Sequence, residues 1–186
     1  MMDQFLEEVV SKRNRGMQTA AYLCANLAWV FFAVYAFLAL QNLALGFSMN
    51  GLNAGLLVSL LQFLIPGGLA VLLFLNRDKT RTEYEYTFTN GQMDFAQVYN
   101  NKKRKNLGTM NIRNVEACGL VASGSFNRYI SMPGIKRTNW FLNRDAELLY
   151  FYFQKDGQKR IIIIEPSKDM VELIKKRLPQ GVWQNN

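Results

Sequence analysis

The charge-free run in the first half of this chain is the feature that most limits how the chain can fold. Residues 16–76 contain no Asp, Glu, Lys or Arg, although the 186-residue chain has 22 basic and 14 acidic residues. About 20 apolar residues span a bilayer as a helix, so this run is long enough for two spans and a turn. A signal peptide has a shorter apolar core, and helices of soluble proteins normally keep a charged face. The sequence therefore predicts an integral membrane protein.

The basic residues around this run predict how the two spans are oriented. We expect the spans at residues 17–40 and 52–75, joined by an uncharged loop at residues 41–51. Basic residues flank the run on both sides, and the loop has none: Lys12, Arg13, Arg15, Arg77, Lys79 and Arg81. Because basic residues next to a span stay on the cytoplasmic side, both termini are expected in the cytoplasm. The expected location is the cell membrane, which the chain crosses twice.

The charge pattern divides the whole chain into four segments. We expect a juxtamembrane amphipathic helix at residues 1–15, the transmembrane hairpin at 16–76, a basic linker at 77–81 and a cytoplasmic domain at 82–186. The first segment is expected to be helical because its apolar residues would share one face of a helix. These residues are Phe5, Leu6, Val9 and Val10. The linker would hold the domain at the membrane surface, since five residues reach at most ~18 Å.

Residues 82–99 predict a β-hairpin. Aromatic residues alternate with polar residues along 82–89, which is typical of a half-buried strand. Asn90-Gly91 follows, and this pair is the strongest short signal for a hairpin turn. Residues 92–99 then form the returning strand.

The remainder of the domain predicts further strands and one final helix. Strands are expected at residues 107–112, 115–121, 147–154 and 159–165, with a basic loop at 100–106 and a loop-rich stretch at 122–143 that holds a short strand near Tyr129. Four consecutive isoleucines at 161–164 indicate a strand that is buried on both faces. Ser167 is a good N-cap for a helix that runs to about Leu178.

The order of these elements resembles a pleckstrin-homology-like domain. The resemblance implies an α+β fold in which a strongly bent antiparallel β-barrel is plugged by one C-terminal helix; a split SH3-like barrel is the alternative. Two spans followed by such a domain resemble small bacterial membrane proteins. The segments YEYTFTNGQMDFAQVYNNKKRKNL, SGSFNRY and MPGIKRTNWFLNRDAE resemble an uncharacterised family of these proteins in Gram-positive bacteria. Membership in that family implies no mechanism.

Few residues of the chain suit catalysis. There is no histidine, and the two cysteines, Cys24 and Cys118, form neither a metal-binding nor a disulfide motif. Asp145 and Glu147 beside Arg144 have a spacing that suits acid–base chemistry, but a polar turn before a strand explains them more simply. No nucleotide-binding or nucleophile motif is present. We therefore expect no enzyme activity, no cofactor and no metal.

The candidate binding residues are basic and aromatic. One group is the run in the expected basic loop: Lys102, Lys103, Arg104 and Lys105. The other group lies in the loop-rich stretch: Arg128, Lys136, Arg137 and Trp140. Both groups suit acidic lipid headgroups at a membrane surface. The alternatives are a solvated loop for the first group and core packing for Trp140.

These observations favour a membrane-surface function without catalysis. We expect the domain to be an interaction module that binds a protein partner or organises a complex. The alternative is a sensor of acidic lipid headgroups or of a small anion, and an enzyme is the least favoured class. A basic excess also suits nucleic acid, but the sequence has no recognition pattern and the membrane anchor explains the charge, so no nucleic acid is expected. The sequence does not identify the partner.

Overall fold

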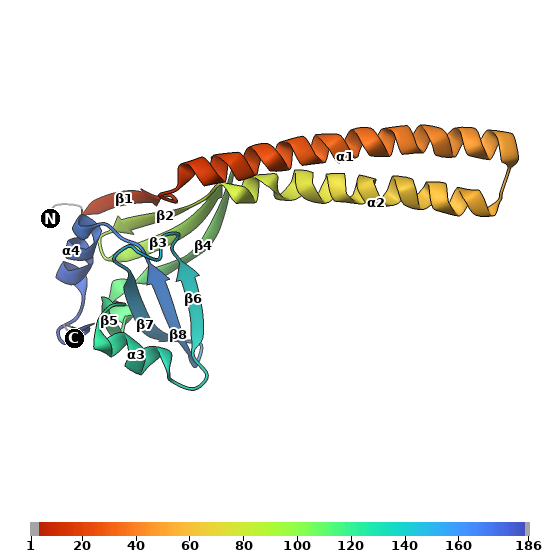
Figure 1. Ribbon diagram of the computed structural model, residues 1–186. Helices are drawn as coiled ribbons and strands as arrows, with labels where there is room; N and C mark the ends of the chain where they lie inside the picture. Colours follow the sequence, from red (N-terminus) through yellow and green to blue (C-terminus); the bar gives the residue numbers. More distant parts are fainter. Residues whose placement is uncertain (1–3, 185–186) are drawn as a thin grey trace. The chain divides into compact units, whose positions relative to one another are not determined.

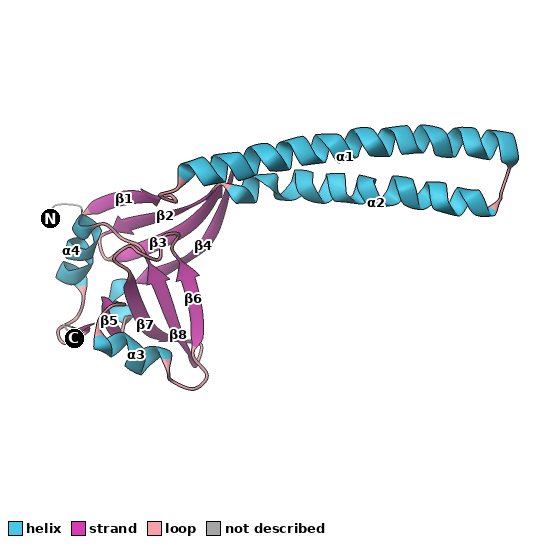
Figure 2. Cartoon of the chain, viewed as in Figure 1, coloured by secondary structure: helices cyan, strands magenta, loops and turns pink. Residues whose placement is uncertain are grey.

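A computed structural model describes residues 4–184, apart from the side chain of Asn50. The chain forms two compact units (Figures 1 and 2). One unit is residues 14–81, and the other combines the residues up to 13 with those from 82 onward. We describe each unit by itself.

The first unit is a hairpin of two long helices, α1 (Arg15–Asn50) and α2 (Ala54–Asn76). Both are long and apolar enough to cross a membrane, and only 11% of the apolar window of each is buried. The expected loop at residues 41–51 is wrong, because α1 continues to residue 50. Its Leu and Ala residues favour helix, and the helix ends only at Gly51, whose φ of 62° suits glycine.

The two helices keep a constant register along the hairpin. The Cβ of Ala36 lies 3.7 Å from the Cβ position that a side chain at Gly67 would occupy. The rings of Trp29 and Phe74 meet edge to face with centroids 5.3 Å apart. Arg77 donates a hydrogen bond to Asn26 over 3.2 Å. Moving one residue toward the C-terminus of α1 therefore corresponds to moving one residue toward the N-terminus of α2.

The base of the hairpin combines basic and aromatic side chains. The Arg77 guanidinium lies 4.3 Å from the ring centroid of Phe74, and that of Arg81 lies 4.3 Å from the centroid of Tyr22. Residues Arg77–Thr80 form a 3₁₀ turn, η1, that continues from α2, so the segment expected as a linker is ordered. Such a belt of aromatic and basic residues is typical of a membrane–water interface.

The second unit contains two β-sheets and two α-helices. The four-stranded sheet has the order β1-β2-β3-β4, with β1 Phe5–Val10, β2 Thr82–Thr89, β3 Gln92–Tyr99 and β4 Lys103–Asn111. The five-stranded sheet has the order β6-β8-β7-β5-β9, with β5 Ala117–Leu120, β6 Lys136–Trp140, β7 Leu149–Lys155, β8 Gln158–Ile164 and β9 Trp183–Gln184. The helices are α3 (Gly124–Ile130), α4 (Lys168–Arg177) and the 3₁₀ turn η2 (Ile112–Asn114).

The expected amphipathic helix at residues 1–15 is wrong over the described residues, because Phe5–Val10 form strand β1; residues 1–3 lie outside the described residues. β1 pairs antiparallel with β2, from Phe5 opposite Thr89 to Val10 opposite Tyr84. Its side chains alternate, so that Val10 is buried while Val9 is exposed. β2 offers β1 a complete row of backbone hydrogen bonds, and this pairing outweighs the helical pattern. The hairpin is therefore inserted between two neighbouring strands of one sheet.

The domain has a core on each side of the five-stranded sheet. The larger core lies between the two sheets and is closed by Met170 and Ile174 of α4. The smaller core lies between the five-stranded sheet and α3, where Phe126 packs with Ile161 and Ile163. Because Ile162 and Ile164 face the larger core, β8 is buried on both faces, as the run of isoleucines predicted.

The expected closed barrel does not form among the described strands. The four-stranded sheet ends at β4 and the five-stranded sheet ends at β6, and no ladder joins them. After β4 the chain passes through η2 and enters the other sheet as β5, which lies between β7 and the short edge strand β9. The fold is thus an α+β arrangement of two packed sheets with a C-terminal helix.

Three local expectations need comment. The basic loop expected at residues 100–106 is wrong, since β4 begins at Lys103 and only a short turn precedes it. This turn is tight because Asn100 and Asn101 both adopt positive φ, a conformation that Asn tolerates. The stretch at 122–143 holds helix α3 where a strand near Tyr129 was expected, and β6 follows it. The final helix is confirmed, and the Ser167 side chain accepts the backbone N–H of Met170 as its N-cap.

Candidate functional site

The first basic group lies at the start of strand β4. Lys103 is opposite Tyr99 of β3, and Tyr99 is opposite Thr82, the first residue of β2. Neighbouring strands lie about 4.8 Å apart, so Lys103 is ~10 Å from the point where the chain leaves the hairpin and enters the sheet. Within the domain, this basic group therefore begins two strands away from Thr82, the first residue of β2.

The side chains of this group do not form one patch. Successive residues of a strand point to opposite faces, so Lys103 and Lys105 share one face while Arg104 lies on the other. The Arg104 guanidinium forms an ion pair of 2.6 Å with Glu85 of β2. This ion pair joins β4 to β2 across the intervening strand β3, above the small side chain of Ala96. An open hollow of about 500 Å³ lies beside it. Arg104 is thus partly neutralised, and Lys102 lies in the preceding turn.

The second predicted group is divided between a surface and the core. Arg128 lies on α3, and Lys136 and Arg137 begin the edge strand β6. Arg137 donates a hydrogen bond of 2.9 Å to Asn139 on the same strand. Trp140 instead packs on Phe95, with ring centroids 4.9 Å apart, and belongs to the larger core. The eight predicted residues therefore do not converge on one site.

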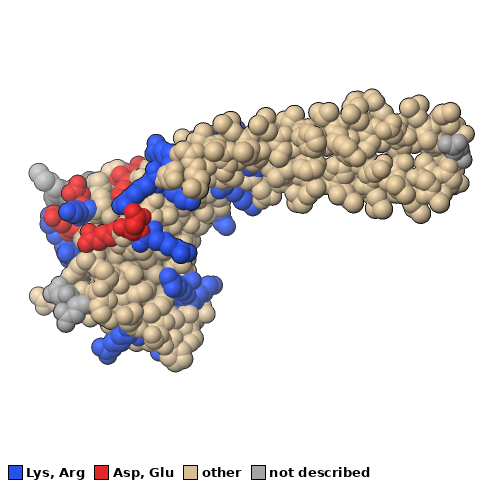
Figure 3. Space-filling view, viewed as in Figure 1, with Lys and Arg blue, Asp and Glu red and all other residues tan. Residues whose placement is uncertain are grey.

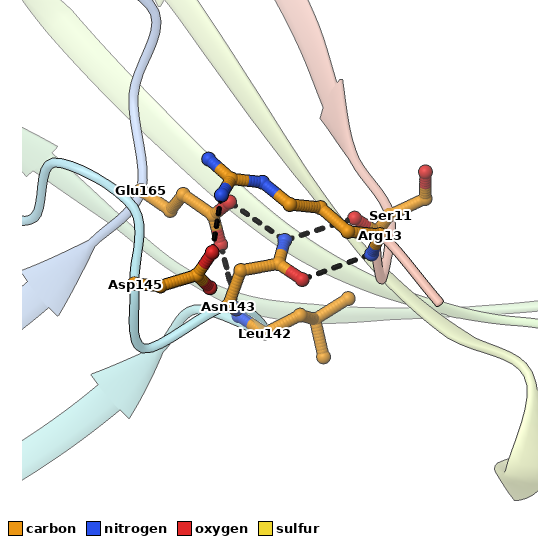
Figure 4. A network of polar contacts seen from close by, with 6 residues as sticks. All are labelled: Ser11, Arg13, Leu142, Asn143, Asp145 and Glu165. Atoms are coloured by element: carbon orange, nitrogen blue, oxygen red, sulfur yellow. Dashed lines mark hydrogen bonds and ion pairs between the residues drawn. The ribbon is translucent and has the colours of Figure 1, made fainter. Parts of the chain in front are cut away.

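A polar network around Asn143 fixes the segment that leads into α1 (Figure 4). Asn143 is the one buried polar residue among those described, with 7% of its surface exposed. Its side-chain oxygen accepts the backbone N–H of Arg13 over 2.9 Å. Its side-chain nitrogen donates to the carbonyl of Ser11 over 3.1 Å and to Glu165 over 2.7 Å. Every hydrogen-bonding group of this amide except one lone pair is therefore used.

The carboxylate of Glu165 organises the other half of this network. It accepts the backbone N–H groups of Leu142 (3.2 Å) and Asn143 (2.9 Å) as well as the Asn143 amide. Glu165 follows β8 directly, so this interior strand, which pairs with β6 and β7, holds the loop after β6 in place. Arg13 also forms an ion pair with Asp145 in that loop. Residues 11–13, the last before the hairpin, are thus clamped to the domain.

The β1 segment is also linked to both ends of α4. Glu8 accepts the backbone N–H of Ser167, the N-cap residue of α4, over 2.9 Å. Arg177, the last residue of α4, donates to the side chain of Gln4 over 2.9 Å. A strand that precedes the hairpin is therefore tied to the helix that ends the domain.

Sequence reasoning missed most of this network. Arg13 was counted only as a flanking cation, and Asn143 was one polar residue among several in an irregular stretch. The partners of Asn143 lie 132 and 22 residues away, which no local pattern encodes. The Asp145 carboxylate, considered for acid–base chemistry, is engaged by Arg13 in the clamp.

Several groups that bear on catalysis have structural roles in the described residues. Cys118 is fully buried, and burial raises the pKa of its thiol, so little reactive thiolate forms at neutral pH. The hydroxyls of Ser123, Ser125 and Tyr150 form a chain with separations of 2.7 and 3.0 Å. Burial also raises the pKa of Tyr150, which makes it a poor base at neutral pH. Among residues 4–184, no group of three acidic or cysteine side chains is arranged to hold a metal ion.

These features define the class of the protein: an α+β domain of the bacterial pleckstrin-homology-like type, interrupted by a hairpin of two long apolar helices. The chain belongs to the DUF6106 family, described as a bacterial PH-like domain, whose family model matches residues 2–184. The match includes both the domain and the hairpin, so the interrupted arrangement lies within the family model. Comparison with curated proteins and with solved structures found no match.

Proposed function

We propose that the chain is a multi-pass cell-membrane protein whose PH-like domain is a non-enzymatic interaction module on the cytoplasmic surface. The outward-facing apolar side chains of α1 and α2 support the membrane location. In the space-filling view the hairpin carries no charged side chain along most of its length (Figure 3). Basic residues at its base support cytoplasmic termini, and Arg77 and Arg81 lie there on aromatic rings.

Reporter fusions test this arrangement in the membrane. A reporter that is active only outside the cytoplasm should be inactive when fused after Asn186 and active when inserted at Gly51. The opposite pattern would contradict the orientation, and a chain that stays in the soluble fraction would contradict the membrane location.

One observation favours a protein partner over the other candidate functions. Of the large apolar side chains that are exposed between residues 4 and 184, only Phe5 and Val9 lie outside the hairpin. They are 61% and 54% exposed and share the outer face of β1. β1 is also an edge strand, so its outer backbone edge has no neighbouring strand in the described sheet. An apolar face beside an open edge suits a partner that adds a strand or covers the patch.

Site-specific photocrosslinking tests this surface. A photoreactive residue at Phe5 or Val9 in the full chain in its native membrane should give a defined adduct with a partner. The same residue at Gln158, the exposed first residue of β8, is the control and should give none. Adducts that are identical at the three positions, or absent at Phe5 and Val9, would contradict a partner surface on β1.

A second candidate function is contact with acidic lipid headgroups, which the position of Lys103 supports. Each basic residue near an anionic leaflet contributes about 1 kcal/mol. Since Arg104 is paired with Glu85, the attraction is expected mainly from Lys102, Lys103 and Lys105. The contact would orient the domain, because the hairpin already fixes the chain in the bilayer.

Binding to vesicles separates these contributions. In a domain whose hairpin is replaced by a short linker, binding to anionic vesicles should be weak and should decrease with salt. Replacing Lys103 and Lys105 by Ser should reduce binding more than replacing Arg104 alone. Equal binding to neutral and anionic vesicles would leave the basic group without a role in lipid contact.

A further inference from the structure

Three amide side chains are exposed near the middle of the hairpin, Gln41 and Asn42 on α1 and Gln62 on α2, and two of them, Asn42 and Gln62, share one flank. Within the described part of the chain, no hydrogen bond is recorded for either amide. Each residue lies nine positions from the turn at residues 51–53, which corresponds to ~14 Å along its helix. If the hairpin spans the bilayer as proposed above, both amides lie well inside the hydrocarbon region.

The two amides lie at the same depth and on the same flank of the hairpin. The register of the helices places residue 42 opposite residue 61, so the amides differ by one residue in height. At about 100° per residue, each lies ~80° from the line of residues that faces the other helix. Because the helices are antiparallel, these equal rotations bring both side chains to one flank.

An amide in hydrocarbon strongly favours a polar partner. Its nitrogen supplies two donors and its oxygen accepts, so one amide can pair with another. Lipid chains offer neither group, and buried polar groups without a partner destabilise the structure. Gln62 is therefore poorly suited to a monomeric hairpin that is surrounded by lipid.

We infer that the hairpin forms a homodimer in the membrane, in which Asn42 and Gln62 of one copy hydrogen-bond to the same residues of a second copy. Copies of a membrane protein share one orientation, so their two-fold axis runs along the membrane normal and preserves depth. Each amide then meets an amide at its own level. Small residues on the same flank, Gly46 and Gly55, permit close approach of the helices.

The flank also shows why a second copy is the expected occupant. Its polar groups are self-complementary. Because both lie at about the same depth, a two-fold axis along the membrane normal lets each amide meet an amide of the second copy. The inference depends on the membrane location proposed above, and it adds the partner of the hairpin to that proposal.

The test measures dimerisation of the full chain in lipid vesicles by energy transfer between labelled copies. We expect a dimer whose dissociation constant rises by about tenfold in Asn42→Leu/Gln62→Leu. The matched control is Gln41→Leu, which changes an exposed amide at the same depth on the side away from α2. The control variant should dimerise as the native chain does.

A cross-linking arm tests the geometry independently of affinity. In a Cys24→Ala/Cys118→Ala background, Asn42→Cys should form a disulfide between copies, and Gln41→Cys should not. A native chain that is monomeric in vesicles, or equal effects at residues 41 and 42, would overturn the proposed dimer. Failure of the native chain to enter vesicles would instead overturn the membrane location, so the two failures are distinguishable.

Discussion

The hairpin and the domain contain the same types of apolar residue, but they place these residues in opposite ways. In the domain Leu149 is fully buried and the exposed faces of the strands are largely polar. In the hairpin Leu64 is 52% exposed, and Leu61 and Ile65 on the same helix are 56% and 60% exposed. In water an apolar surface of this size would drive aggregation, whereas in a bilayer it is the favoured arrangement. The contrast supports the membrane location proposed above, in which the domain folds in water and the hairpin folds in lipid.

The same substitution in the two units should therefore have different effects. Ile163→Asp places a charge in a site that is 1% exposed between β8 and α3, and should cost at least ~4 kcal/mol, enough to unfold the domain. Leu64→Asp changes an exposed position, which in water would cost less than about 0.5 kcal/mol. In a membrane it should cost about 3 kcal/mol of insertion free energy.

Two measurements report the effects of these two substitutions. Protease resistance reports folding of the domain, and resistance to alkaline extraction reports insertion of the hairpin. A folded Ile163→Asp domain would show that the core is misplaced. Unchanged insertion of Leu64→Asp would show that lipid does not surround α2 at this position.

Removing the hairpin tests whether the domain folds without it. The experiment is possible because the two units share no secondary-structure element. Replacing residues 14–81 by a short Gly/Ser linker should give a soluble folded domain, with β1 and β2 joined as an ordinary hairpin. Residues 82–186 alone should be largely unfolded or aggregated. They lack the buried Val10 and the links from Gln4 and Glu8 to α4. Loss of these contacts approaches the total stability of ~5–15 kcal/mol that is usual for a domain.

Circular dichroism and size-exclusion chromatography compare these two proteins directly. Equal stability of the two would mean that β1 contributes nothing to the domain and that the hairpin precedes an independent tail.

The network around Asn143 is the next test, since it holds the residues that precede α1 against the rest of the domain. Asn143→Ala leaves Glu165 and the Ser11 carbonyl with fewer partners and should cost about 2–3 kcal/mol in the linked domain. Asp145→Ala removes only an exposed ion pair with Arg13 and should cost at most about 1 kcal/mol. Urea unfolding measures both, and a reversed order would contradict the role assigned to Asn143.

Much of the fold was accessible from local patterns. Asn90-Gly91 and Asp156-Gly157 both form turns with positive φ, and Ser167 caps α4 as expected. These elements are encoded by residues that are close in sequence. The resemblance to PH-like proteins also predicted the family correctly.

The parts that failed depend on contacts between distant residues. The segment FLEEVV fits a helical and an extended pattern equally well. It becomes a strand only because it pairs with β2, which begins about 70 residues later in the sequence. The basic run at 102–105 looked like a loop, yet pairing with β3 draws it into β4. The hydrogen-bond network around Asn143 also joins residues that are distant in the sequence. The candidate site was therefore less predictable than the fold.

Alkaline pH should have the smallest effect, and only on the domain. Burial raises the pKa of Tyr86, whose hydroxyl donates to the Trp140 carbonyl and accepts the backbone N–H of Glu165. The unfolded chain loses this proton at about pH 10, before the folded chain does. Stability of the linked domain should therefore be constant below about pH 9 and decrease above pH 10.

Urea unfolding at several pH values measures this decrease. Tyr86→Phe should be less stable at neutral pH but should show a shallower decrease, with the remainder due to Tyr150 and Tyr152, whose pKa values burial also raises. An unchanged slope in Tyr86→Phe would contradict the raised pKa of Tyr86.

The central claim is that the apolar hairpin is inserted in the sequence between two adjacent strands of one sheet, and a cross-strand disulfide tests it most directly. In the full chain in membranes, with Cys24→Ala and Cys118→Ala, Glu7→Cys and Thr87→Cys place two thiols at paired positions of β1 and β2. We predict a disulfide within one chain under mild oxidation, detected by mass spectrometry. The control pair, Glu7→Cys with Glu83→Cys, is displaced by ~13 Å along β2 and should not form one. Absence of the first disulfide, or equal formation of both, would contradict the pairing of β1 with β2 across the hairpin.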